Sequence, residues 1–285
     1  MDRNAKRLVS ALSISLFIAS TLFFLILVSL GVRGPELWQQ AIFLAGFGAA
    51  MACLFVAAVK LGKRTAGMAA LLCLAFVYLA MQSPRYFPSI VLQLFLLSFP
   101  FAWYLLVKRK KIENVLSEFG IRGKGWVLAA AAGVAATIFL LYPLMLAEVI
   151  LLRLVGITDI SNVSQVIRDA PFWLMACSFT VAPFAEEIFF RAFLITGFAG
   201  IAKGLWKRVP ENAALAAGVL GSTVIFMLAH YSYGSITEFV GAFTIGLLFA
   251  LLFVRFRSLA MVVAAHAVFN FISVMVTYYW SSLPS

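Results

Sequence analysis

Long apolar stretches, separated by short segments that hold most of the charges, limit the possible folds of this chain more than any other feature. The first stretch, residues 8–30, contains 23 residues and no charged side chain. A helix needs about 20 mostly apolar residues to cross a membrane. Apolar residues make up 64% of the 285-residue chain, against roughly 45–50% in soluble domains. The sequence therefore excludes a water-soluble globular domain and predicts a membrane protein.

The apolar pattern predicts nine membrane spans. They cover residues 8–30, 38–60, 66–82, 88–107, 126–152, 172–199, 213–231, 239–254 and 259–280. We expect helices, because an open strand would leave backbone groups unpaired in lipid and a barrel would show short alternating segments. The predicted fold class is all-α, a polytopic transmembrane helix bundle of about nine spans.

The positive charges predict the orientation of the spans. Lys and Arg outnumber Asp and Glu by 22 to 11, but the cations lie in short runs between spans and form no basic face of the kind that binds nucleic acid. With the N-terminus in the cytoplasm, 17 cations fall in inside segments, 4 in outside segments and 1 within a span. This distribution follows the positive-inside rule. We therefore expect a cytoplasmic N-terminus, and a lipid bilayer rather than nucleic acid as the partner.

The same pattern divides the chain into three regions. Residues 1–107 form an N-terminal four-helix membrane region, residues 108–125 a cytoplasmic connection, and residues 126–285 the C-terminal core. The connection combines a basic run at 108–111 with apolar residues at helical spacing, namely Ile112, Val115, Leu116 and Phe119. This pattern favours a helix that lies on an anionic membrane surface, and docking to a protein is the alternative.

Three charged residues lie within the sixth predicted span, where a charge at the bilayer centre costs about 2.5–3.5 kcal/mol. Glu187 and Arg191 are four residues apart and are expected to form an ion pair on one helix face. Glu186 points about 100° away from Glu187. A purely structural ion pair accounts for one Glu and one Arg but not for the second carboxylate, which favours a functional site.

Pro183 precedes this cluster by three residues. Proline cannot donate a hydrogen bond to the residue four positions earlier, so the sequence predicts that the helix bends or restarts there.

Both histidines of the chain lie within or at the end of a predicted span. Phe226 and His230 are four residues apart, and so are His266 and Asn270. His230 could instead be an interfacial residue, and His266 with Asn270 a hydrogen-bonding pair between helices. Together with Glu186, one imidazole is suited to activating water, and the other imidazole with an amide is suited to stabilising an oxyanion. At about 1.5 Å per residue, the predicted span ends place Glu186, His230 and His266 roughly 20, 25 and 11 Å deep.

These three motifs resemble those of a known family. Glu186-Glu187-x-x-x-Arg191, Phe226-x-x-x-His230 and His266-x-x-x-Asn270, in this order on three helices, are similar to the motifs of the CAAX prenyl protease type II and bacteriocin-processing family of intramembrane glutamate proteases. The resemblance covers roughly residues 112–280.

The resemblance implies an intramembrane endopeptidase that hydrolyses a membrane-associated peptide or lipidated protein, prenylated or apolar, without metal or cofactor. It implies that Glu186 and His230 activate the water and that His266 and Asn270 form the oxyanion hole. Glu187 and Arg191 would hold the helix and tune Glu186. It also implies a multi-pass protein of a prokaryotic cell membrane.

Several other functions remain open at this point. Two His and two Glu residues could bind zinc, although the chain has no H-E-x-x-H motif and adjacent glutamates on a regular helix cannot both face one ion. A non-catalytic bacteriocin-immunity or scaffold protein could bind peptides through the same polar cluster. A proton-coupled carrier could use Glu186 as its relay, but we find no inverted repeat of the kind such carriers have.

Overall fold

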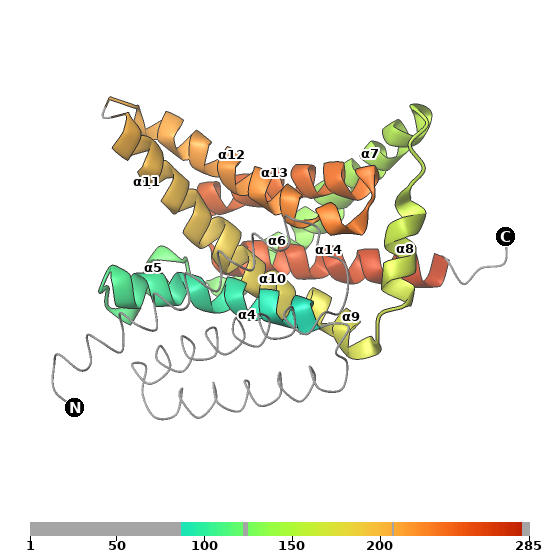
Figure 1. The fold of residues 1–285 in the computed structure, drawn as a ribbon, viewed down its shortest axis with the longest axis horizontal. Coiled ribbons are helices and arrows are strands. Elements are labelled where there is room, and N and C mark those ends of the chain that lie inside the picture. The colour runs from blue at the N-terminus through green and yellow to red at the C-terminus, as the bar shows by residue number, and fades with distance from the viewer. Residues whose placement is uncertain (1–86, 122–124, 207, 281–285) are drawn as a thin grey trace, which may run out of the picture. The chain divides into compact units, whose positions relative to one another are not determined.

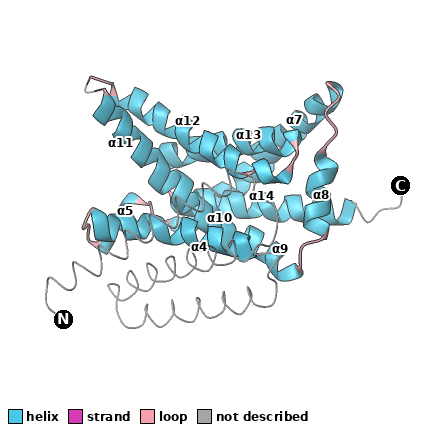
Figure 2. Ribbon diagram, viewed as in Figure 1, coloured by secondary structure: helices cyan, strands magenta, loops and turns pink. Residues whose placement is uncertain are grey.

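The computed structural model describes residues 87–121, 125–206 and 208–280, and within these ranges the chain consists of helices and loops (Figure 2). The elements are α4 (Phe87–Ala102), η2 (Trp103–Val107), α5 (Ile112–Glu118), α6 (Trp126–Ala136), η3 (Thr137–Leu141), α7 (Tyr142–Leu154), α8 (Ile160–Arg168), α9 (Phe172–Phe179), α10 (Val181–Glu186), η4 (Glu187–Leu194), α11 (Ile195–Leu205), α12 (Glu211–Ala229), η5 (Tyr231–Tyr233), α13 (Ile236–Phe256) and α14 (Leu259–Trp280). A boundary between Val115 and Leu116 separates two compact units.

Five helical stretches in the second unit are long and apolar enough to cross a membrane. They are Trp126–Leu154, Phe172–Leu205, Glu211–Ala229, Ile236–Phe256 and Leu259–Tyr278. They correspond to the last five predicted spans, which confirms a membrane protein whose described residues form helices and no strands. The fourth predicted span, 88–107, corresponds to α4 and η2. The first three lie outside the described residues, so the total of nine spans stays a prediction.

The surface of these helices is apolar. Large hydrophobic side chains are exposed along them, among them Leu128, Phe139, Leu146, Leu220 and Leu251. Such a surface is unfavourable in water and matches the hydrocarbon of a bilayer.

Small residues let the helices of the second unit approach closely. Helix α14 packs on α6, and α12 packs on α11 and α13 (Figure 1). A Cβ atom at Gly133 would lie 2.1 Å from the Met261 carbonyl oxygen, and one at Gly218 would lie 2.4 Å from the carbonyl oxygen of Ile195. Only glycine fits at such contacts between helices in lipid. Close packing of this kind holds α14, which carries His266, and α12, which ends directly before His230.

A hydrogen bond from η3, which follows α6 directly, adds to the packing against α14. The hydroxyl of Thr137 donates to the carbonyl oxygen of Ala265 at 2.9 Å. Ala265 immediately precedes His266, so this bond fixes the backbone next to a predicted site residue.

The predicted membrane-surface helix forms, but its apolar face is covered by protein. Helix α5 spans Ile112–Glu118, and the side chains of Val115 and Phe119 are fully buried. The interpretation that these two residues face lipid was therefore wrong. Gly120 lies in the turn that follows the helix, and its φ of 69° favours glycine. The Gly120 carbonyl oxygen accepts a hydrogen bond from the N–H of Leu259 at 3.3 Å, which ties the chain after α5 to the start of α14.

The span that carries the charged cluster is interrupted, as Pro183 predicted. Helix α9 ends at Phe179, Thr180 has φ −120° and ψ −73°, and α10 begins at Val181. The missing N–H of Pro183 would have bonded to residue 179, which explains the position of the break.

A π-helical segment, η4, follows directly after α10. Within it, the Phe190 carbonyl oxygen accepts a hydrogen bond from the Ser222 hydroxyl of α12. Wide helical turns of this kind are frequent at functional sites, and this one begins at Glu187.

Candidate functional site

The predicted ion pair between Glu187 and Arg191 forms at the start of η4. Arg191 Nε lies 3.0 Å from Glu187 Oε2, and both side chains are fully buried. The guanidinium carbon is 4.6 Å from the centroid of the Phe226 ring and 5.8 Å from those of Phe190 and Phe249. Glu187 thus compensates the charge of Arg191, and the guanidinium also makes cation–π contacts with these three rings.

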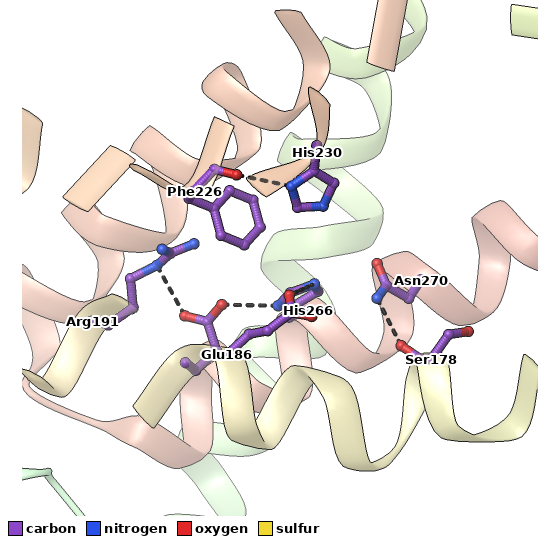
Figure 3. A network of polar contacts seen from close by, with 8 residues as sticks. Ser178, Glu186, Arg191, Phe226, His230, His266 and Asn270 are labelled. Atoms are coloured by element: carbon purple, nitrogen blue, oxygen red, sulfur yellow. Dashed lines mark hydrogen bonds and ion pairs between the residues drawn. The ribbon is translucent and has the colours of Figure 1, made fainter. Parts of the chain in front are cut away.

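Glu187 also orients His266, a contact that the sequence did not indicate. His266 Nδ1 lies 2.8 Å from Glu187 Oε1, and its Nε2 lies 3.8 Å from Glu186 Oε2. The dashed lines that begin at Arg191 and at His266 in Figure 3 mark their contacts with Glu187, which is drawn without a label. The imidazole from α14 therefore stands between two adjacent carboxylates of the broken span.

The two glutamates differ in their access to solvent. The Glu187 side chain is 0% exposed, whereas that of Glu186 is 15% exposed. Because Glu187 is held by both Arg191 and His266, Glu186 is the carboxylate of the pair that water or a substrate can reach.

The ring nitrogens of His230 are distinguished by a hydrogen bond. His230 caps the end of α12, and its Nδ1 lies 2.9 Å from the carbonyl oxygen of Phe226 (Figure 3). A carbonyl oxygen only accepts, so Nδ1 carries the proton and donates to it. The lone pair of the neutral ring is therefore on Nε2, where it can accept a proton.

Phe226 brings the two imidazoles together. The centroid of its ring lies 4.7 Å from that of His230 and 6.0 Å from that of His266. The depths calculated from span ends separated these groups, which was wrong. The calculation assumed straight α-helical spans perpendicular to the membrane, whereas the π-helical segment η4 lies between the predicted span end at residue 199 and Glu186.

Asn270 lies one helical turn after His266 and points toward the break at Thr180. Its Nδ2 donates to the carbonyl oxygen of Ser178 at 2.8 Å (Figure 3). An amide nitrogen has two hydrogens, so one N–H positions the side chain and the other remains for a further acceptor.

Two further ionisable residues next to His230 were missed. The Tyr233 ring stacks on His230, with centroids 5.9 Å apart. Burial, followed by the charges of Glu238 and Glu186, raises the pKa of Tyr233, so its phenol stays protonated. Glu238 also interacts with His230. The eighth span was predicted to start at residue 239, which left Glu238 in a loop, whereas α13 starts at Ile236.

Glu148 was missed although it lies inside the fifth predicted span. Its Oε1 is buried and has no hydrogen-bond partner within the described part of the chain. It lies 3.8 Å from the position that a Cβ atom at Gly241 would take. An ionisable residue within a membrane span is a candidate functional residue, so the same rule that identified Glu186 would also have identified Glu148.

In the described ranges, no group of three or more His, Cys, Asp or Glu side chains is arranged to hold a metal ion. Glu186, Glu187 and His266 lie close together, but Glu187 Oε1 and Oε2 are already engaged by His266 and Arg191. The site therefore presents acid–base and hydrogen-bonding groups.

Part of the chain matches a known protein family. The model of a family described as type II CAAX prenyl endopeptidase, Rce1-like, matches residues 168–272. No curated protein and no solved structure matches the chain. The matched segment includes all of the predicted site residues, which are Glu186, Glu187, Arg191, Phe226, His230, His266 and Asn270. Residues 168–272 of this membrane protein are therefore similar to the Rce1-like family of type II CAAX prenyl endopeptidases.

Proposed function

We propose that the protein is an intramembrane glutamate endopeptidase that hydrolyses a peptide bond without a metal ion. The observation that carries this proposal is the position of Glu186. The carboxylate of Glu186 is accessible and lies 3.8 Å from His266 Nε2. The carboxylate of the adjacent Glu187 is buried, and its two oxygens are bonded to Arg191 and His266. We therefore assign catalysis to Glu186 and not to Glu187.

In this proposal Glu186 and His230 activate the attacking water. The carboxylate orients the water, and His230 Nε2 accepts its proton while Nδ1–H remains bonded to the Phe226 carbonyl oxygen. A fixed tautomer of this kind keeps the lone pair directed at one place, which favours general-base catalysis. The hydroxide attacks the peptide carbonyl, and the proton then passes to the leaving amine as the C–N bond breaks.

His266 and Asn270 would stabilise the oxyanion that forms. His266 would act through Nε2, since its Nδ1 is bonded to Glu187. The second N–H of Asn270 supplies the other donor. Preorganised donors of this type contribute about 2.7–4 kcal/mol each when aimed at an oxyanion.

The substrate that we propose is a membrane-associated peptide or lipidated protein, prenylated or otherwise apolar. Its apolar part would reach the site through lipid, because the helices around the site expose hydrophobic side chains. We also propose a prokaryotic cell membrane with the N-terminus in the cytoplasm, in keeping with the 17 to 4 distribution of cations in the loops.

The test is hydrolysis of peptides by the purified full chain in liposomes. A C-terminal peptide with a farnesylated cysteine and the same peptide without the lipid are incubated with wild type and Glu186→Gln, and the products are identified by mass spectrometry. We expect cleavage of the farnesylated peptide by wild type and loss of at least about 100-fold in Glu186→Gln.

Two outcomes would contradict the proposal. Cleavage that disappears with a chelator and returns with zinc would show metal-dependent hydrolysis. Binding of the peptide by wild type and Glu186→Gln alike, with no cleavage by either, would support the non-catalytic scaffold or immunity function instead.

A further inference from the structure

A side chain from outside the family match contacts the start of α13, a few residues after His230. Asp159 lies immediately before α8, in the connection between α7 and α9, and its carboxylate accepts hydrogen bonds from the first residues of α13. The donors are the Ser235 hydroxyl at 3.1 Å, the Thr237 backbone N–H at 3.2 Å, the Thr237 hydroxyl at 2.6 Å and the backbone N–H of Ile236. Four donors from three consecutive residues thus converge on one carboxylate.

The start of α13 depends on this carboxylate. The first N–H groups of a helix have no partner within it, and the helix dipole favours a negative charge there. Ser235 caps the helix by accepting from the Glu238 N–H at 3.1 Å, and its own hydroxyl donates to Asp159. Asp159 therefore completes the cap from 76 positions earlier in the chain.

The capped segment is the corner that follows His230. Six residues, 230–235, connect the end of α12 to the start of α13, and we call them the His230 corner. Within it, Tyr233 stacks on His230, and Gly234 has φ 62°, a conformation that favours glycine. Helix α8 contacts η5, α13 and α14. Because only these six residues separate α12 from α13, a displacement of the start of α13 would also displace His230.

We propose that Asp159 is a positioning residue, which clamps the start of α13 and thereby fixes the His230 corner relative to Glu186. This inference rests on the proposed function for its effect on catalysis. It assigns a role to a residue outside 168–272, the segment matched by the family model.

The clamp is charged throughout the neutral pH range. Burial opposes ionisation of Asp159, but the hydrogen bonds from Thr237, Ile236 and Ser235 outweigh it and lower the pKa of the carboxyl group. A lowered folded-state pKa means that the stabilisation is complete above the ordinary value of about 3.9. It is lost only as the pH falls through the still lower value in the folded protein.

The experiment compares Asp159→Ala and Asp159→Asn with wild type, using the full chain in liposomes and the farnesylated peptide. We expect Asp159→Ala to lower kcat by about 10- to 100-fold with KM within about twofold, since misplacement of a catalytic group acts on the chemical step. Asp159→Asn retains one acceptor oxygen and should recover part of kcat. Asp169→Ala, an exposed position at the other end of α8, is the matched control and should leave kcat unchanged.

Amide hydrogen exchange at Ile236 and Thr237 provides a readout that does not depend on catalysis. We expect exchange to be at least about 10-fold faster in Asp159→Ala, because both N–H groups lose their acceptor. Unchanged exchange would overturn the clamp. Faster exchange with unchanged kcat would overturn the positioning role. If wild type shows no hydrolysis that depends on Glu186, the proposed function fails, and exchange alone then decides whether Asp159 holds the corner.

Discussion

The candidate site has a buried half and an accessible half, and adjacent residues of one helix fall into different halves. The buried half contains Glu187, Arg191 and His266, of which the first two side chains are 0% exposed and the third 4%. The accessible half contains Glu186, at 15% exposure, with His230 and the start of α13. In the buried half both Glu187 carboxylate oxygens have a charged or ring-nitrogen neighbour, whereas in the accessible half the Glu186 side chain keeps part of its surface exposed.

The two halves therefore have different roles, which are compensation of buried charge and supply of the reacting groups. The buried half compensates charge and fixes the imidazole of His266, so its loss should primarily affect folding. The accessible half supplies a carboxylate and an imidazole lone pair to solvent, so its loss should primarily affect the reaction. The predictions below test this separation, beginning with the largest expected effect.

Glu186→Gln tests the accessible half. We expect hydrolysis of the farnesylated peptide to fall by about 10²- to 10⁴-fold, since a positioned acid–base group typically contributes that factor. The same variant should unfold within about 1 kcal/mol of wild type, because the position is accessible to solvent. A change in thermal unfolding in detergent without a change in kcat would reverse the assignment of the two glutamates.

Glu187→Gln tests the buried half. Removing the charge leaves Arg191 buried without its counter-charge, which typically costs about 3–5 kcal/mol. Thermal unfolding of the detergent-solubilised chain measures the effect. The double variant Glu187→Gln/Arg191→Met should recover much of the loss, since it removes the uncompensated charge.

An exposed ion pair provides the control for this prediction. Lys203 and Glu211 are 3.2 Å apart, but their side chains are 50% and 83% exposed. Glu211→Gln should leave thermal unfolding almost unchanged, because exposed pairs contribute little. Equal effects of Glu187→Gln and Glu211→Gln would contradict the distinction between a buried and an exposed pair.

Asn270→Ala tests whether the amide contributes to the oxyanion hole. The change removes one donor to the oxyanion, and kcat should fall by about 10²- to 10³-fold with little change in KM. Loss of the bond to Ser178 should cost only about 1 kcal/mol of stability. A change in KM with kcat preserved would instead place Asn270 in substrate binding.

Thr137→Val tests the support of the buried half at the backbone of α14. The change removes the hydrogen bond to the Ala265 carbonyl oxygen and should destabilise the protein by about 0.6 kcal/mol, the average for such bonds in membranes. Thr223→Val is the matched control. The Thr223 hydroxyl is buried with no hydrogen-bond partner within the described ranges, so its removal should be neutral or stabilising in the same thermal unfolding measurement.

The spans, the break before Pro183 and the ion pair of Glu187 with Arg191 were predictable because each depends on residues close together in the sequence. Hydrophobic length sets the spans, the missing proline N–H sets the break, and the i, i+4 spacing sets the pair. The contact of Glu187 with His266 joins residues 79 positions apart, and helical periodicity contains no information about which distant faces meet.

Other features were not predicted because they depend on the exact end of a span or on which distant segment a residue contacts. The sequence prediction assigned Glu238 to a loop, because the predicted start of the eighth span was three residues too late. The apolar face of α5 has the same periodicity whether lipid or protein covers it, and the burial of Val115 and Phe119 was therefore not predictable. Asp159 carries no motif, and only the folded chain brings it to α13.

The joint action of Glu186 and His230 on one water molecule is the central claim, and a double-mutant cycle tests it most directly. The kcat/KM for the farnesylated peptide is measured for wild type, Glu186→Gln, His230→Gln and the double variant. If both residues activate the same water, each single change should cost at least about 100-fold, and the double variant should be within about threefold of the worse single variant, because residues that act as a unit are not additive. Two effects that multiply in the double variant, or either single variant within about threefold of wild type, would contradict the account.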